Sequence, residues 1–191
     1  MATDKQQGGR EAPPFSAQHL DIAAFAEAGA CLAGETVLSH YPRLADEVLD
    51  TDQDTPVRWQ AQGQLVPVLG GSPECWLELD IGVDLPLQCQ RCLEPMRQPL
   101  QVSRRFRFVR DEATAEMLDD ELEDDVLVIS RDFDLHGLIE DELLMELPVA
   151  PRHDVCPQQP RMQVQTADFR EEEAEKPNPF AALEALKKPR S

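Results

Sequence analysis

Two cysteines separated by two residues are the side chains of this chain whose spacing most clearly indicates chemistry. Cys89 and Cys92 lie between an apolar run and the sequence Leu-Glu-Pro. Thiols at this spacing can supply two ligands of a tetrahedral metal site or form a redox-active dithiol. A second pair, His153 and Cys156, has the same spacing further along the chain. The set Cys89, Cys92, His153 and Cys156 is therefore a candidate zinc site.

Two alternatives to zinc stay open at this point. A chain with five cysteines holds some by chance, so Cys89 and Cys92 could be an unliganded structural pair. They could also be a redox dithiol, but a thioredoxin-like site places the first cysteine at the start of a helix, whose dipole lowers the thiol pKa. Pro95 and the strand-like sequence on both sides do not fit that arrangement. We therefore expect two strands to position the cysteines.

The segments that flank the two cysteines alternate between apolar and polar residues. Before them, Cys75, Leu77, Leu79 and Ile81 fall on one face of a strand. After them, the same rule places Val102, Arg104, Phe106 and Phe108 on one face, with Ser103, Arg105, Arg107 and Val109 opposite. The pattern predicts an antiparallel hairpin with the Cys-x-x-Cys sequence at its tip.

The remaining patterns predict an α+β fold: a mainly antiparallel sheet, which could close into a barrel, and one well-defined helix after it. That helix begins at the cap Asp134 and ends before Pro148, and we expect Glu140, Asp141, Glu142 and Glu146 to face water. The other expected elements are helices within 15–30 and 35–49, strands at 57–61, 65–69 and 126–129, and an acidic loop or frayed helix over 111–125.

The length of 191 residues fits one domain of ordinary size with tails. We expect a disordered leader (1–14), a single α+β domain (15–157), an acidic linker (158–177) and a C-terminal helix (178–188), with mobile termini. Phe180, Leu183 and Leu186 form an apolar stripe on that last helix, which could bind a partner or pack on its own domain. No apolar run approaches the roughly 18 residues that span a bilayer, so we expect a cytoplasmic protein without a membrane partner.

The formal net charge of −19 argues against a general nucleic-acid coat protein. The charges are segregated, however. Residues 88–110 hold six arginines against one glutamate, whereas residues 111–147 hold fifteen acidic residues against one arginine. Five arginines are candidate RNA contacts: Arg91, Arg97, Arg104, Arg105 and Arg107. The alternative is that Phe106 and Phe108 point into the core and the arginines neutralise the acidic segment that follows.

Catalytic patterns are scarce in the chain. There is no glycine-rich phosphate loop, no Gly-x-Ser-x-Gly and no His-Glu-x-x-His. Paired aspartates at 119–120 and 124–125 could hold magnesium in a nuclease, but such pairs are common in any acidic loop. We therefore expect a protein that is not an enzyme and takes no small-molecule substrate.

Three separated motifs resemble the YceD family of large ribosomal RNA subunit accumulation proteins. They are Leu87–Pro95, the helix and loop over 134–154, and Lys176–Lys187. The resemblance implies a role in the synthesis, processing or stability of 23S ribosomal RNA in a bacterium, without an established catalytic reaction. Other branches of the family carry a richer cysteine cluster after the helix than the lone Cys156 of this chain.

Two functional hypotheses follow from the resemblance and the charges. In the first, the chain is a non-enzymatic assembly factor that joins a 23S ribosomal RNA precursor or an early large-subunit particle, with the arginines touching phosphate. In the second, it is an acidic adaptor that never contacts RNA. The adaptor would bind ribosomal proteins or RNA-processing enzymes through the terminal helix and residues 111–147.

Overall fold

The computed structural model describes residues 15–49, 53–119 and 124–157. These residues all lie in one compact unit. The expected leader (1–14), acidic linker (158–177) and C-terminal helix (178–188), with its stripe Phe180, Leu183 and Leu186, lie outside the described residues.

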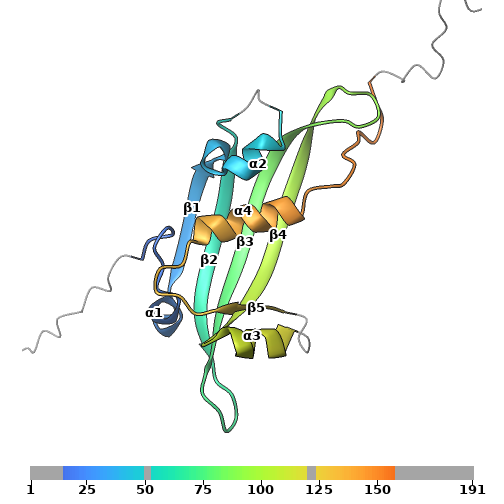
Figure 1. Cartoon of the computed structure of the whole chain (residues 1–191). Coiled ribbons are helices and arrows are strands. Elements are labelled where there is room, and N and C mark those ends of the chain that lie inside the picture. Colours follow the sequence, from blue (N-terminus) through green and yellow to red (C-terminus); the bar gives the residue numbers. More distant parts are fainter. Residues whose placement is uncertain (1–14, 50–52, 120–123, 158–191) are drawn as a thin grey trace, which may run out of the picture. The chain divides into compact units, whose positions relative to one another are not determined.

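A five-stranded sheet with the order β1-β2-β3-β4-β5 forms the centre of the unit (Figure 1). Its strands are β1 (Cys31–Val37), β2 (Pro56–Val66), β3 (Glu74–Gln88), β4 (Pro95–Val109) and β5 (Asp125–Val128). The pairs β1–β2, β2–β3 and β3–β4 are antiparallel, as expected. However, β5 runs parallel to β4. The expectation of a barrel is wrong, because β1 and β5 form the two edges of an open sheet.

The helices expected within residues 15–30 and 35–49 are shorter than predicted. The elements are α1 (Ile22–Glu27), a 3₁₀ turn (Leu38–His40), α2 (Pro42–Asp46), α3 (Glu112–Asp119) and α4 (Leu135–Met145). The first expected helix therefore shrinks to α1, whose cap is Asp21. The second is replaced by the end of β1, the 3₁₀ turn and α2, whose first residue is Pro42. None of the helices in the described ranges is long and apolar enough to cross a membrane.

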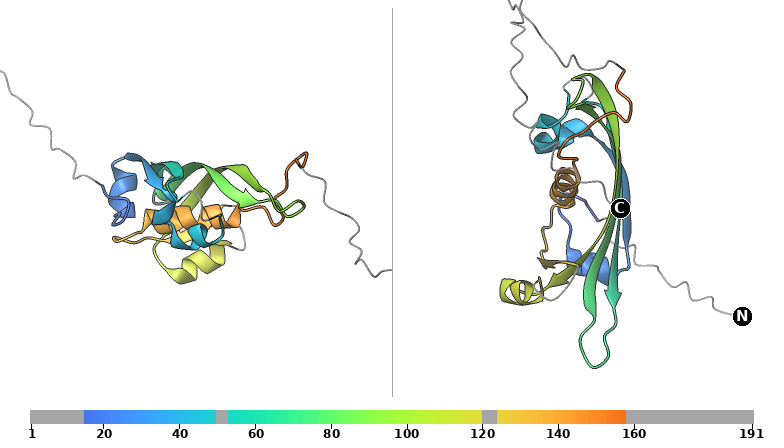
Figure 2. Two further views of the ribbon diagram at one scale, coloured as in Figure 1. Left: turned by 90° about the horizontal axis from the view of Figure 1, so that it is seen from above. Right: turned by 90° about the vertical axis from the view of Figure 1, so that its right-hand side faces the viewer.

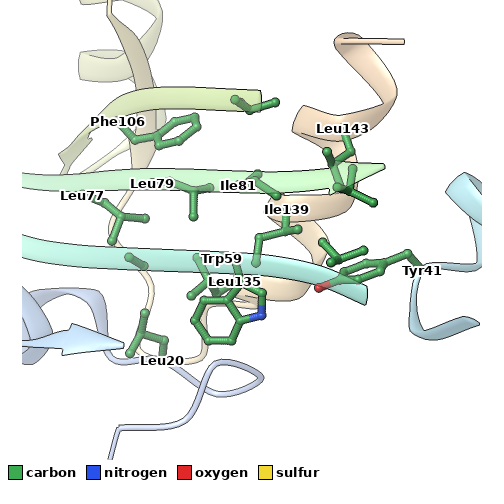
Figure 3. Close-up of a cluster of buried hydrophobic side chains, with 14 of the residues drawn as sticks. Leu20, Tyr41, Trp59, Leu77, Leu79, Ile81, Phe106, Leu135, Ile139 and Leu143 are labelled. Carbon is green, nitrogen blue, oxygen red and sulfur yellow. The ribbon is translucent and has the colours of Figure 1, made fainter. Parts of the chain in front are cut away.

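The helix α4 confirms the strongest helix prediction and covers one face of the sheet (Figure 2). The Asp134 carboxylate caps it by accepting hydrogen bonds from the N–H groups of His136 (3.0 Å) and Gly137 (3.1 Å). Its apolar residues recur every four positions, so they form one stripe that points at the sheet. The stripe and the strand residues that it meets are shown in Figure 3, where Leu135, Ile139 and Leu143 lie near Trp59, Leu79 and Ile81.

Two glutamates of α4 are buried, which corrects the expectation that its acidic residues all face water. Glu140 is 6% exposed and accepts hydrogen bonds from the backbone N–H groups of Arg43 (2.7 Å) and Leu44 (3.2 Å). The Arg43 guanidinium also pairs with it at 2.7 Å, so this carboxylate holds α2 against α4. Glu142 is 3% exposed and lies 3.4 Å from the Arg104 guanidinium. Residues of α2 and β4 therefore bury two positions of α4 that we expected to be exposed to water.

Glu142 should make the stability of the protein depend on pH. Burial, and then repulsion from Asp125, raises the pKa of its carboxyl group above the ordinary value of 4.5. Ionised Glu142 therefore destabilises the folded state above its folded-state pKa, and this penalty disappears as the pH falls toward 4.5. We expect Glu142→Gln to be more stable than the wild type at neutral pH, with a difference that shrinks on acidification.

The measurement is urea denaturation of both proteins at a series of pH values. Glu140→Gln is the matched control on the same helix. It should be less stable than the wild type at neutral pH, because it weakens an ion pair that is already satisfied. A stability difference between Glu142→Gln and the wild type that stays constant with pH would contradict the prediction.

Candidate metal centre

Cys89 and Cys92 lie in the connection between β3 and β4, at the tip of the expected hairpin. The strand pairing ends with Gln88 opposite Pro95. Beyond it, the Cys89 N–H donates to the Glu94 carbonyl (3.0 Å) and the Leu93 N–H donates to the Cys89 carbonyl (2.8 Å). These two bonds close a tight turn that holds both thiols at the same end of the sheet.

Leu93 completes this turn with a left-handed backbone conformation. Its φ of 64° makes it the one non-glycine residue with positive φ among the described residues. The conformation costs an L-amino acid with a side chain roughly 1–2 kcal/mol. The Gln88 side-chain amide donates to the Leu93 carbonyl (3.1 Å) and helps to fix it. The hairpin thus keeps a strained residue immediately after Cys92, as functional sites often do.

The second pair of ligands arrives on the segment that follows α4. The Gln90 N–H donates to the Pro151 carbonyl (2.8 Å), and the Arg91 guanidinium donates to the His153 carbonyl (2.8 Å). Figure 1 shows this segment, coloured orange, running beside the tip of the β3–β4 hairpin. These contacts place His153 and Cys156 next to Cys89 and Cys92.

The four side chains form a compact cluster with suitable metal-binding geometry. Their ligand atoms all lie within 4.8 Å of one another. The Cys89 and Cys156 sulfur atoms are 3.8 Å apart, and the Cys92 sulfur is 3.4 Å from His153 Nδ1. Tetrahedral zinc bonds of about 2.3 Å to sulfur and 2.0 Å to nitrogen imply edges of roughly 3.8 and 3.5 Å. The group can therefore hold a metal ion, and its cysteines are free thiols.

The surroundings of the cluster favour ionised sulfur at Cys89, whereas burial raises the pKa of the Cys92 thiol. Cys89 is fully buried, which opposes ionisation, but hydrogen bonds from the backbone of His153, Cys92 and Arg91 lower the pKa of its thiol to about 5. The Arg91 Nε donates to the Cys156 sulfur at 3.0 Å. Thiolates are the metal-binding form of cysteine. Arg91, which the sequence indicated only as an RNA contact, thus also supports the cysteine cluster, and no sequence signal pointed to this role.

The arginines proposed to contact RNA lie on both faces of β4. Arg104 faces α4, where its guanidinium is 3.4 Å from Glu142 and 3.5 Å from Glu146. Arg97 donates to the main chain of the neighbouring strand β3. Arg91 is at the hairpin tip. The structure therefore does not gather the five arginines into one surface.

Arg105 and Arg107 lie on the face of the sheet opposite α4. Arg105 stacks over the ring of Trp76 at 4.6 Å and lies 3.7 Å from Glu78. Arg107 pairs with Glu74 at 2.7 Å. The two phenylalanines between the arginines, Phe106 and Phe108, are buried in the core, which agrees with the alternative interpretation of this strand. Arg104 meets Glu142 and Glu146 of the acidic segment 111–147, whereas Arg105 and Arg107 meet glutamates of β3.

The fold and the cluster define an α+β protein with an open sheet and a candidate metal centre built from three cysteines and one histidine. A model of the family "Large ribosomal RNA subunit accumulation protein YceD" matches residues 77–187. A protein of that name from Haemophilus influenzae is 32% identical over 149 residues, which is 76% of this chain and 80% of the relative. The chain belongs to the YceD family. A comparison with solved structures gives no significant match.

The strained turn gives a test of the hairpin geometry. Leu93→Gly should raise the free energy of unfolding by about 1 kcal/mol, because glycine adopts positive φ without a steric penalty. Leu93→Val should lower it, because β-branched residues tolerate this conformation least. Chemical denaturation measures both. Equal stability of the glycine and valine variants would show that the backbone at residue 93 is not left-handed in solution.

Proposed function

We propose that this chain is a non-enzymatic factor that supports the synthesis, processing or stability of 23S ribosomal RNA during assembly of the large ribosomal subunit. Its membership in the YceD family is the observation that carries the proposal, because the family name refers to accumulation of the large ribosomal RNA. The relative from Haemophilus influenzae carries the same name. The proposed site of action is the cytoplasm.

We assign zinc to the cluster of Cys89, Cys92, His153 and Cys156. Three thiolates and one imidazole are a common ligand set of structural zinc sites, whereas a catalytic zinc keeps one position for water. Four protein ligands would leave no such position. The ion would therefore act by fixing the segment after α4 to the hairpin tip, in agreement with a protein that is not an enzyme.

Two modes of action are compatible with this role. In the first, Arg91, Arg97, Arg104, Arg105 and Arg107 contact phosphate groups of precursor RNA. In the second, the chain is an acidic adaptor that binds a ribosomal protein or an RNA-processing enzyme and does not touch RNA. The ion pairs of Arg104 and Arg107 with glutamates favour the adaptor, because phosphate would have to compete with a carboxylate already in place.

Elemental analysis of the purified protein tests the zinc assignment. We expect about one zinc per chain in the wild type, by the ligand chemistry of structural sites. Cys89→Ser and Cys156→Ser should lose most of it, because each removes one thiolate. Cys31→Ser is the matched control, since Cys31 is an exposed cysteine outside the cluster. Equally low zinc in all four proteins would eliminate the metal centre.

Deletion of the gene in its native bacterium tests the function. The ratio of 23S to 16S ribosomal RNA should fall, and the wild-type gene should restore it. Cys31→Ser should also restore the ratio, whereas Cys89→Ser should not. An unchanged ratio in the deletion strain would contradict the proposal.

Ultraviolet crosslinking in cells separates the two modes of action. Direct contact predicts crosslinks to 23S ribosomal RNA that weaken in Arg97→Gln and Arg105→Gln, with Arg58→Gln as the control on another strand. Glutamine is preferable to glutamate here because a charge reversal at Arg105 would place a second carboxylate beside Glu78. Complete absence of crosslinks from the wild type would support the adaptor.

A further inference from the structure

A largely apolar groove lies between α4 and β5, away from the metal ligands. It has a volume of about 510 Å³. The apolar part of its lining comes from strands and helix alike: Phe106, Leu127, Leu138, Leu144 and Met145. Met145 is 68% exposed, so the groove opens to solvent beside it. A long aliphatic or aromatic side chain of a ligand could pack against these apolar residues.

Every charged residue that lines the groove is acidic. They are Asp125 at the start of β5, and Asp141 and Glu142 on α4. Asp141 is already paired with Arg43 at 2.7 Å, whereas Asp125 is exposed and forms no ion pair among the described residues. The exposed carboxylate of Asp125 therefore places a negative charge next to the apolar wall, which attracts cations and repels phosphate.

Glu142 places a second, buried carboxylate at the groove. Its side chain is 3% exposed, and its Oε2 atom accepts no hydrogen bond from any described residue. The Arg104 guanidinium forms an ion pair with it at 3.4 Å, so the charge of this carboxylate is already partly balanced. Buried carboxylate oxygens are almost always hydrogen-bonded. A hydrogen-bond donor entering the groove could satisfy this atom.

We propose that the groove between α4 and β5 binds a basic, partly apolar segment of a partner protein. An arginine or lysine of that segment would place its aliphatic stem on Leu138 and Met145 and its cationic head beside Asp125 and Glu142. RNA is not the expected occupant, because its phosphates would meet the exposed carboxylate of Asp125 and no cationic residue of the lining. The inference does not depend on the metal centre, and it holds whether or not the chain contacts ribosomal RNA elsewhere.

Fluorescence anisotropy with the full chain tests the proposal. The probe is a labelled synthetic peptide in which arginine alternates with leucine. The comparison peptides replace arginine by glutamate or leucine by glycine, and an oligouridine RNA serves as a further competitor. The arginine–leucine peptide should bind most tightly, because it alone supplies both the cation and the apolar surface that the groove complements.

Exposed positions allow the groove to be altered without disturbing the core. Met145→Arg places a cation at the opening and should weaken binding of the arginine–leucine peptide at least tenfold. Asp125→Asn removes one carboxylate and should weaken it about threefold. Asp80→Asn, an identical change at an exposed position on the opposite face of the sheet, should change it less than twofold. Circular dichroism of each variant checks that the fold is retained.

Several outcomes would overturn the proposal. They are no binding of the arginine–leucine peptide to the wild type, equal binding to the wild type and Met145→Arg, and equal effects of Asp125→Asn and Asp80→Asn. Displacement of the peptide by oligouridine would assign the groove to RNA instead. Nuclear magnetic resonance shifts at Leu127 and Leu144 on peptide addition would support the groove, whereas shifts confined to other residues would exclude it.

Discussion

Burial of one apolar stripe of α4 against the sheet is the constraint on which the cluster of Cys89, Cys92, His153 and Cys156 depends. Leu135, Ile139 and Leu143 are fully buried, and such side chains each contribute about 1.5–3 kcal/mol when removed from water. The stripe fixes the direction in which α4 crosses the strands. The chain therefore leaves α4 toward the hairpin tip, and His153 and Cys156 reach Cys89 and Cys92 without a long loop (Figure 1).

The parts of this architecture that follow from local patterns could be predicted from the sequence. The alternation of apolar and polar residues predicted the β3–β4 hairpin. The spacing of four residues predicted the buried side of α4, and Asp134 predicted where this helix begins. The types and spacing of the two ligand pairs gave a set of four residues that the fold brings together. Each of these inferences requires only a few consecutive turns or strand residues, where the sequence determines the geometry directly.

Features that depend on distant segments could not be predicted in this way. Whether the sheet closes depends on the tilt and stagger of all its strands, and the parallel β5 depends on the path of the chain through α3. The expectation that the acidic residues of α4 face water assumed that the sheet is the sole neighbour of this helix. Glu140 instead meets α2, whose sequence gave no indication of that contact. Likewise, alternation placed Arg104, Arg105 and Arg107 on the correct faces of β4 but could not reveal their glutamate partners.

The two ligand pairs lie far apart in the chain, and this separation has a mechanical consequence. An ion held by residues 89–92 and 153–156 would act as a clasp that closes one large loop containing β4, α3, β5 and α4. On a chain-entropy model, such a crosslink disfavours the unfolded state by roughly 4 kcal/mol. Loss of the ion would open this loop, and the contacts of Gln90 and Arg91 would then hold residues 151–156 at the hairpin tip.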